Sequence, residues 1–70
     1  MHKAVQQGNE EMVVFLLQRG ANVNIRDKDG NTPMHYAVSF EQHAIVNTLI
    51  DAGASQREPN RCGKIPWEGL

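Results

Sequence analysis

The chain is 70 residues long, with 40% apolar and 21% charged residues and a formal net charge of −1. A chain of this length forms at most one small domain, and such domains are only marginally stable unless a disulfide or a metal reinforces them. The single cysteine, Cys62, cannot close an intramolecular disulfide, and no Cys/His cluster has the spacing of a zinc site. The chain therefore packs unusually well or shares apolar surface with a neighbour.

Composition also excludes several classes of function. The Lys and Arg residues are spread along the chain without a basic stripe, which argues against a nucleic acid partner. The apolar run over residues 13–17 is far shorter than the roughly 20 residues that cross a bilayer, so we expect no membrane insertion. No secretory signal is visible, and a lone cysteine is typical of a reducing compartment. We therefore expect an intracellular location, either cytoplasmic or nuclear.

The chain repeats itself with a period of 33 residues. Ten residues recur at this shift, where chance would give roughly two or three. The recurring pairs are Met1/Met34, His2/His35, Ala4/Ala37, Val5/Val38, Val13/Val46, Leu16/Leu49, Gly20/Gly53, Ala21/Ala54, Gly30/Gly63 and Pro33/Pro66. Successive copies of one unit therefore make up the chain.

The first unit contains a predicted helix with one apolar stripe. Its apolar residues recur at the spacing i, i+1, i+4 and i+5, which is typical of a helix that buries one face. Gly20 follows as the glycine that ends the helix. The stripe consists of Met12, Val13, Leu16 and Leu17.

The second unit begins with a turn and a short helix. Residues 27–31 are turn-forming, with Gly30 free to take a positive φ. Thr32 is a helix N-cap residue and Pro33 suits the first helical position, so we predict a helix over residues 33–40. A second helix is predicted over residues 44–52, and Gly53 ends it. Its stripe repeats that of the first unit: Ile45, Val46, Leu49 and Ile50.

Two motifs resemble those of ankyrin repeats. Residues 32–37 (Thr-Pro-Met-His-Tyr-Ala) resemble the family's Thr-Pro-Leu-His-x-Ala motif, and residues 16–24 resemble its Leu-Leu-x-x-Gly-Ala-Asp-Val-Asn ending. The resemblance implies an all-α repeat (solenoid) of helix-turn-helix units with short connecting β-turn or hairpin loops. It makes residues 1–70 an ankyrin repeat fragment with a partial first repeat (1–26), a complete repeat (27–59) and the start of a terminal or truncated repeat (60–70).

The chain departs from the family pattern at three places. Glu41 stands where the family has glycine between its two helices, and Arg57 replaces the asparagine that Asn24 provides in the first unit. Residues 65–68 (Ile-Pro-Trp-Glu) replace Thr-Pro-Leu-His, which weakens the expected capping network of the third unit. Trp67 takes the place of a buried leucine, so we expect it in the core or in a cap.

The histidines are the most obvious candidates for chemistry. For His35 the resemblance implies a structural role, in which the side chain is tied to Thr32 and to loop backbone. No Ser, Cys or carboxylate accompanies it at a defined spacing, so catalysis is not expected. His2 takes the same structural role, and a metal site built from His35 and His43 is not expected. We therefore predict a non-enzymatic protein without cofactor or metal.

The remaining polar residues have simple interpretations. Asp27 and Asp29 lie in a glycine-containing turn, where they form the turn and stay solvated. Cys62 lies near a turn tip and is interpreted as a bystander, with a redox switch as the alternative. Leu16 and Val23 lie upstream of Asn24 in an arrangement that resembles the acceptor context for asparaginyl hydroxylation. The alternative is a structural asparagine that bridges the backbone between turns.

The resemblance implies a protein–protein interaction module that presents turn tips and the inner helix face to a protein partner. The alternative is a purely structural segment that stacks between or caps other repeats, while recognition lies elsewhere. Phe40 and Tyr36 have the alternative of packing within the repeats. Self-association through open repeat ends is a further possibility. Besides Gln6, Gln7 and Cys62, the candidate contact residues are Lys28, Asp29, Asn31, Tyr36, Ser39, Phe40, Arg61 and Lys64.

Overall fold

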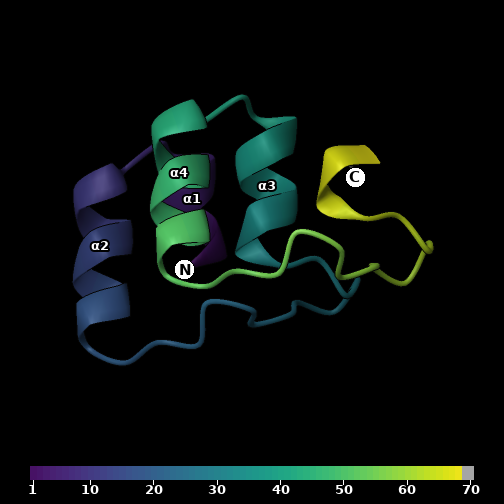
Figure 1. Cartoon of the computed structure of the whole chain (residues 1–70), viewed down its shortest axis with the longest axis horizontal. Helices are drawn as coiled ribbons and strands as arrows, with labels where there is room; N and C mark the ends of the chain where they lie inside the picture. The colour runs from purple at the N-terminus through teal and green to yellow at the C-terminus, as the bar shows by residue number, and fades with distance from the viewer. Residues whose placement is uncertain (69–70) are drawn as a thin grey trace.

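A computed structural model describes residues 1–68 of the chain. Within these residues the fold is all-helical, without strands, as the sequence predicts (Figure 1). Four α-helices are followed by one short 3-10 helix. The elements are α1 (His2–Gln6), α2 (Glu10–Gln18), α3 (Pro33–Ser39), α4 (His43–Asp51) and η1 (Pro66–Glu68).

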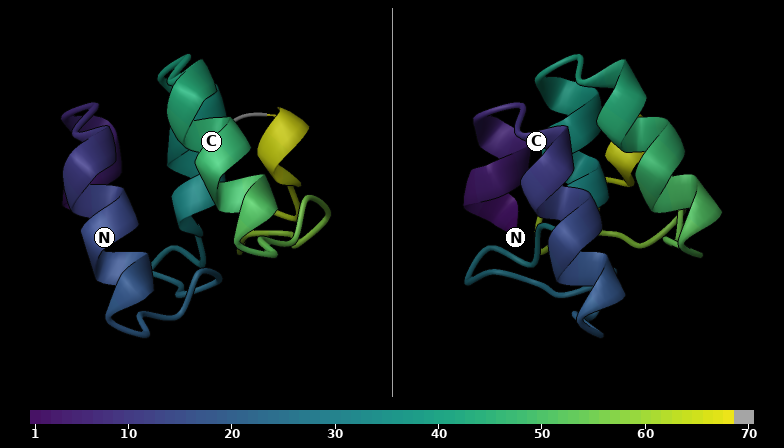
Figure 2. Two further views of the ribbon diagram at one scale, coloured as in Figure 1. Left: turned by 60° about the vertical axis from the view of Figure 1, so that its left-hand side comes forward. Right: turned by 90° about the vertical axis from the view of Figure 1, so that its left-hand side faces the viewer.

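The helices pack in two rows that lie side by side. Helix α1 packs against α3, and η1 continues this row on the other side of α3. Helix α2 packs against α4 to form the second row (Figure 2). Within each unit a short turn joins the two helices, so that α1 packs on α2 and α3 on α4. A long loop leads from α2 to α3, and another from α4 to η1 (Figure 1).

The predicted helix boundaries are correct to within one residue. Helix α3 starts at Pro33 after the N-cap residue Thr32, and α4 starts one residue before the predicted position. Gly20 and Gly53 follow α2 and α4 with φ values of 89° and 90°. The N–H of the next residue, Ala21 or Ala54, donates to a carbonyl five residues earlier at 3.0 or 2.9 Å. This is the glycine-dependent helix ending that the sequence predicts.

The core fills the space between the two rows. Its buried apolar residues come from both units and from all four α-helices, with one alanine after α4. Equivalent residues of the two units share this core, which is how a repeat fold makes a continuous interior. The buried apolar residues are Ala4, Val5, Val13, Met34, Ala37, Ile45, Val46, Leu49 and Ala54.

Two expected core positions are corrected by the structure. Met12 is 43% exposed, whereas Ile45, its equivalent in the second unit, is 1% exposed. The difference arises because α2 covers one side of α4, while no described residue covers the corresponding side of α2. Trp67 is 53% exposed, whereas its equivalent Met34 is fully buried. Helix α3 has a neighbour on each side, α1 and η1, but η1 has a neighbour only on the α3 side among residues 1–68.

The departure at Glu41 has a conformational cost. After both α1 and α3 the chain turns through a residue with positive φ, which is 70° at Gly8 and 57° at Glu41. The hydrogen bonds are the same at both places: Asn9 donates to Ala4 at 2.9 Å and Gln42 to Ala37 at 2.8 Å. A side chain in this left-handed conformation costs roughly 1–2 kcal/mol. The fold therefore accepts strain at Glu41 that it avoids at Gly8.

We expect Glu41→Gly to stabilise the chain by about 0.5–1 kcal/mol, because relief of strain exceeds the added entropy of the unfolded chain. Gly8→Ala should destabilise it by about 1–2 kcal/mol. A Cβ at Gly8 would also lie 2.9 Å from the side-chain nitrogen of Gln42. Urea unfolding followed by circular dichroism measures both changes. Equal effects of the same sign would contradict this account.

Candidate functional site

Two loops at the start of successive units have the same internal hydrogen bonds. The Asp27 carboxylate accepts the backbone N–H groups of Asp29 and Asn31, each at 2.9 Å. One period later the Asn60 side-chain oxygen accepts those of Cys62 at 2.9 Å and Lys64 at 3.0 Å. Each loop is therefore a closed turn held by its first side chain, as the turn-forming residues predict.

The two loops are also joined to each other. The backbone N–H of Arg61 donates to the carbonyl of Asp29 at 3.0 Å. The side-chain amide of Asn60 donates to the side-chain oxygen of Asn31 at 2.8 Å. Because these bonds join residues of different units, they fix the separation of the two loop tips.

Histidines tie each first helix to the loop of the next unit. The backbone N–H of Thr32 donates to Nδ1 of His35 at 3.0 Å, so Nδ1 is an acceptor and the ring proton lies on Nε2. This Nε2 then donates to the carbonyl of Lys64 at 2.8 Å. His2 makes the equivalent bond to the carbonyl of Asn31 at 2.7 Å. Both imidazoles hold backbone in place, which is the structural role that the resemblance implies.

Asn31 has a different environment from the other candidate contact residues. It is 8% exposed, and its side chain and carbonyl are both used in the bonds to Asn60 and His2. The turn pattern alone suggested an exposed position, because it does not show that a neighbouring loop covers this residue. We therefore leave Asn31 out of the contact surface.

The exposed candidates form two groups along α3. Lys28, Asp29 and Arg61 lie at the joined loop tips, and all three are exposed. Ser39 and Phe40 are exposed at the other end of α3, roughly 10 Å away along the helix axis. Their equivalents in the first unit, Gln6 and Gln7, are exposed at the end of α1, which lies beside α3. Lys64 is also exposed and follows the second loop tip.

Tyr36 lies between the two groups in a row of three rings. Its ring centroid is 5.0 Å from that of His2 and 6.2 Å from that of Phe40, and both contacts are edge-to-face. Such geometry is favourable for aromatic pairs. Phe40, at the end of the row, is 45% exposed. Phe40 is therefore an accessible ring whose position is held by its contact with Tyr36.

A hydrogen bond from the Tyr36 hydroxyl to the Asp27 carboxylate joins this row to the first loop. This bond, together with partial burial, raises the pKa of Tyr36 above its usual value of 10.0. Burial alone would raise the pKa of Asp27. The hydrogen bonds from Tyr36, Asn31 and Asp29 outweigh that effect and hold the Asp27 pKa below its usual 3.8.

Asn24 bridges the two units on the side of the second helices. Its side-chain oxygen accepts the backbone N–H of Ser55 at 2.8 Å. In the second unit Arg57 stands at the equivalent position and is exposed. This hydrogen bond supports the interpretation of Asn24 as a residue that bridges the backbone between units. Hydroxylation of Asn24 stays a prediction.

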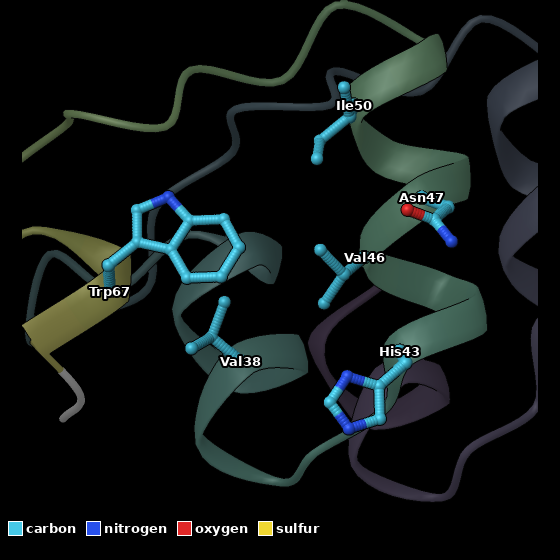
Figure 3. A pocket seen from close by; sticks show the side chains of 6 residues that line it. All are labelled: Val38, His43, Val46, Asn47, Ile50 and Trp67. Carbon is cyan, nitrogen blue, oxygen red and sulfur yellow. The ribbon is translucent and has the colours of Figure 1, made fainter.

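Sequence reasoning missed a groove between α4 and η1 (Figure 3). Its volume is about 250 Å³. The 33-residue period could have indicated this groove. Its lining residues Val38, Val46 and Ile50 occupy the same repeat positions as residues of the first unit that pack in or against the core. The complete lining is Val38, His43, Val46, Asn47, Ile50 and Trp67.

The described residues hold no cluster of three or more metal-ligating side chains. Cys62 is exposed at the second loop tip. The one ion pair in the described part of the chain joins Arg26 to Glu58, between the loops that follow α2 and α4. No helix formed by residues 1–68 is long and apolar enough to cross a membrane.

We expect Tyr36→Phe to cost about 1 kcal/mol of stability at neutral pH, because the variant keeps the ring contacts and loses one hydrogen bond to a charged group. The folded-state pKa of Asp27 is lowered, so its contribution is present above 3.8 and is lost as the pH falls through the folded value. The difference in the free energy of unfolding between wild type and variant should therefore shrink as the pH falls below 3.8. Urea unfolding across an acidic pH series measures it, and a pH-independent difference would contradict the assigned bond.

Comparison with known proteins places the chain in a family. Residues 1–50 match the family model described as ankyrin repeats (many copies). The chain is 43% identical over 54 residues to an ankyrin repeat protein of fowlpox virus, covering 77% of this chain and 12% of that protein. It is 46% identical over 60 residues to one of Acanthamoeba polyphaga mimivirus, covering 86% of this chain and 14% of that protein.

A further relative is protein phosphatase 1 regulatory subunit 27 of Mus musculus, at 39% identity over 66 residues, covering 94% of this chain and 43% of that protein. The chain thus spans less than half the length of each of these relatives. Ankyrin repeats are generally protein-interaction modules. From the matched motifs, the shared period and the all-helical fold, the chain belongs to the ankyrin repeat family.

Proposed function

We propose that this chain is a non-enzymatic segment that binds a protein partner through its loop tips and the exposed end of its first-helix row. The observation that supports this most directly is the pair of joined loops beside the row of three rings. Lys28, Asp29 and Arg61 supply charge at one end, and Phe40 supplies an accessible aromatic ring at the other.

The loop-tip surface is suited to binding because hydrogen bonds hold it rigid. The bonds between Arg61 and Asp29 and between Asn60 and Asn31 order the loop tips before any partner arrives. A surface that is already ordered loses little conformational entropy on binding. Aromatic residues with partly supported rings are frequent anchors of protein interfaces, and Phe40 rests on Tyr36 in this way.

A second function, structural stacking between or capping of other repeats, is supported by a separate observation. The exposed Met12 on α2 and the groove beside Trp67 are open apolar sides at the two ends of the helix rows. Stacking would use these sides and leave the loop tips without a partner. The two functions therefore predict different effects for substitutions on the loops.

An intracellular location is part of the proposal. It rests on the single cysteine, which is exposed in the structure and would be prone to oxidation outside a reducing compartment.

We expect the double variant Lys28→Glu with Phe40→Ala to weaken binding of the partner at least tenfold, because it reverses a loop charge and removes the aromatic anchor. The partner is isolated by affinity capture, identified by mass spectrometry and titrated calorimetrically. The matched control is Arg57→Glu with Phe15→Ala, which likewise reverses one exposed basic charge and removes one exposed phenylalanine ring, at sites outside the two joined loop tips. Equal affinity of both double variants, with unchanged melting, would favour the stacking function.

We further propose Asn24 as a hydroxylation site. An oxygen-dependent asparaginyl hydroxylase would insert one oxygen atom of O₂ into the Cβ–H bond and oxidise 2-oxoglutarate to succinate and carbon dioxide. Incubation with such an enzyme should raise the intact mass by one oxygen atom, located at Asn24 by peptide sequencing. Because the Asn24 oxygen bonds to Ser55, the folded chain should react more slowly than a peptide of residues 16–30. An unmodified peptide would end the proposal.

A further inference from the structure

The chain has two phenylalanines, and they differ in whether a cation covers the ring. Phe15 is 50% exposed and Phe40 is 45% exposed. The guanidinium carbon of Arg19 lies 5.4 Å from the centre of the Phe15 ring, which is within the range of a cation–π contact. Among residues 1–68 no Lys or Arg side chain covers Phe40 in this way. The exposed part of the Phe40 ring is therefore accessible to a cation from outside the chain.

An unpaired carboxylate stands next to the Phe40 ring. Glu41 follows Phe40 directly, its side chain is exposed, and it is the only Asp, Glu, Lys or Arg of residues 30–50. In the described part of the chain the one ion pair joins Arg26 to Glu58, so no cation of residues 1–68 neutralises Glu41. Consecutive Cα atoms lie about 3.8 Å apart, so one bound group can contact both side chains.

Stacking of a further unit does not cover this position. Gln7 of the first unit is equivalent to Phe40, and Gln7 is exposed although α3 packs beside α1. The end of a first helix thus stays accessible when the next unit is in place. At the position equivalent to Glu41 the first unit has Gly8, so the ring and the carboxylate occur together only in the second unit.

Both residues are held in place before any ligand arrives. The Phe40 ring makes an edge-to-face contact with Tyr36, with ring centroids 6.2 Å apart. The backbone N–H of Glu41 donates to the carbonyl of Val38 at 3.1 Å, and that of Gln42 donates to Ala37 at 2.8 Å. These bonds fix the turn that carries Glu41, so little backbone order is lost when a ligand binds there.

A guanidinium group matches this pair of side chains. It is planar, it stacks on aromatic faces, and it donates two parallel N–H groups to a carboxylate. We propose that Phe40 and Glu41 form a subsite for one arginine side chain of the protein partner. This inference rests on the proposed function, because it names the partner group that contacts Phe40.

The subsite gives the strained conformation of Glu41 a function. Its φ of 57° lies in the left-handed region, where glycine carries no steric penalty. Glycine at this position would relieve the strain and would also remove the carboxylate. Binding and stability should therefore change in opposite directions in Glu41→Gly, as is common where a strained residue serves a site.

The test uses Nα-acetyl-arginine methylamide as the probe and the full 70-residue chain labelled with ¹⁵N. A titration at constant ionic strength should shift the amide resonances of Phe40 and Glu41 in a saturable way. The citrulline analogue has nearly the same shape without the charge and should leave both resonances in place. Glu41→Gln and Phe40→Leu should each weaken probe binding roughly threefold or more. Asp51→Asn, which removes another exposed carboxylate, should leave it unchanged.

Glu41→Gly separates binding from folding, because it should raise the urea midpoint while it weakens probe binding. Equal shifts with the arginine and citrulline probes, undiminished binding by Glu41→Gln, or no shift at Phe40 and Glu41 would each overturn the subsite. If Phe40→Leu unfolds, Glu41→Gln decides the question. The probe is a single amino acid that reports on residues 39–41, so its failure would leave the loop-tip binding surface to the separate test with the captured partner.

Discussion

The hydrogen bond from a histidine of each first helix to a backbone carbonyl of the next loop joins each repeat unit to the following one. His35 bonds to Lys64 at 2.8 Å and His2 to Asn31 at 2.7 Å, one period apart. On its other nitrogen His35 accepts the N–H that begins α3, so one ring closes a helix start and fixes the following loop. Because each imidazole spans two units, the loops, the helix row and the contact surface are held as one body.

Stability in this chain depends on helix packing both within and between units. Neither a disulfide nor a metal cluster reinforces residues 1–68, so burial must come from helix packing. The contrast between Ile45 and Met12 shows how local this burial is, since equivalent residues are enclosed or exposed according to whether a neighbouring helix is present. In a repeat fold, stability depends on such nearest-neighbour interfaces. Apolar side chains that have no neighbouring helix among residues 1–68, such as Met12, are correspondingly exposed.

The two proposed surfaces differ because they arise in different ways. The loop tips are held by hydrogen bonds within and between the two loops, while the side chains of Lys28, Asp29 and Arg61 are exposed. The groove is mainly apolar, lined by Val46 and Ile50 of α4 and by Trp67 of η1. A partner at the proposed loop surface would gain affinity from charge and one aromatic anchor, whereas a repeat stacked on the groove would gain it from apolar burial.

The sequence by itself determined the period, the helix positions, the glycine-ended helices and the family, because these depend on local conformation and on residue spacing. It also predicted the structural role of His35 and the turn positions of Lys28 and Asp29, and it left open whether Phe40 is a contact residue or packs within the repeats. Only the tertiary structure decided that Asn31 is covered, that Met12 and Trp67 are exposed, and that a groove lies beside α4. The physical reason is that burial depends on the neighbours that pack against a side chain, and equivalent positions of a repeat have different neighbours.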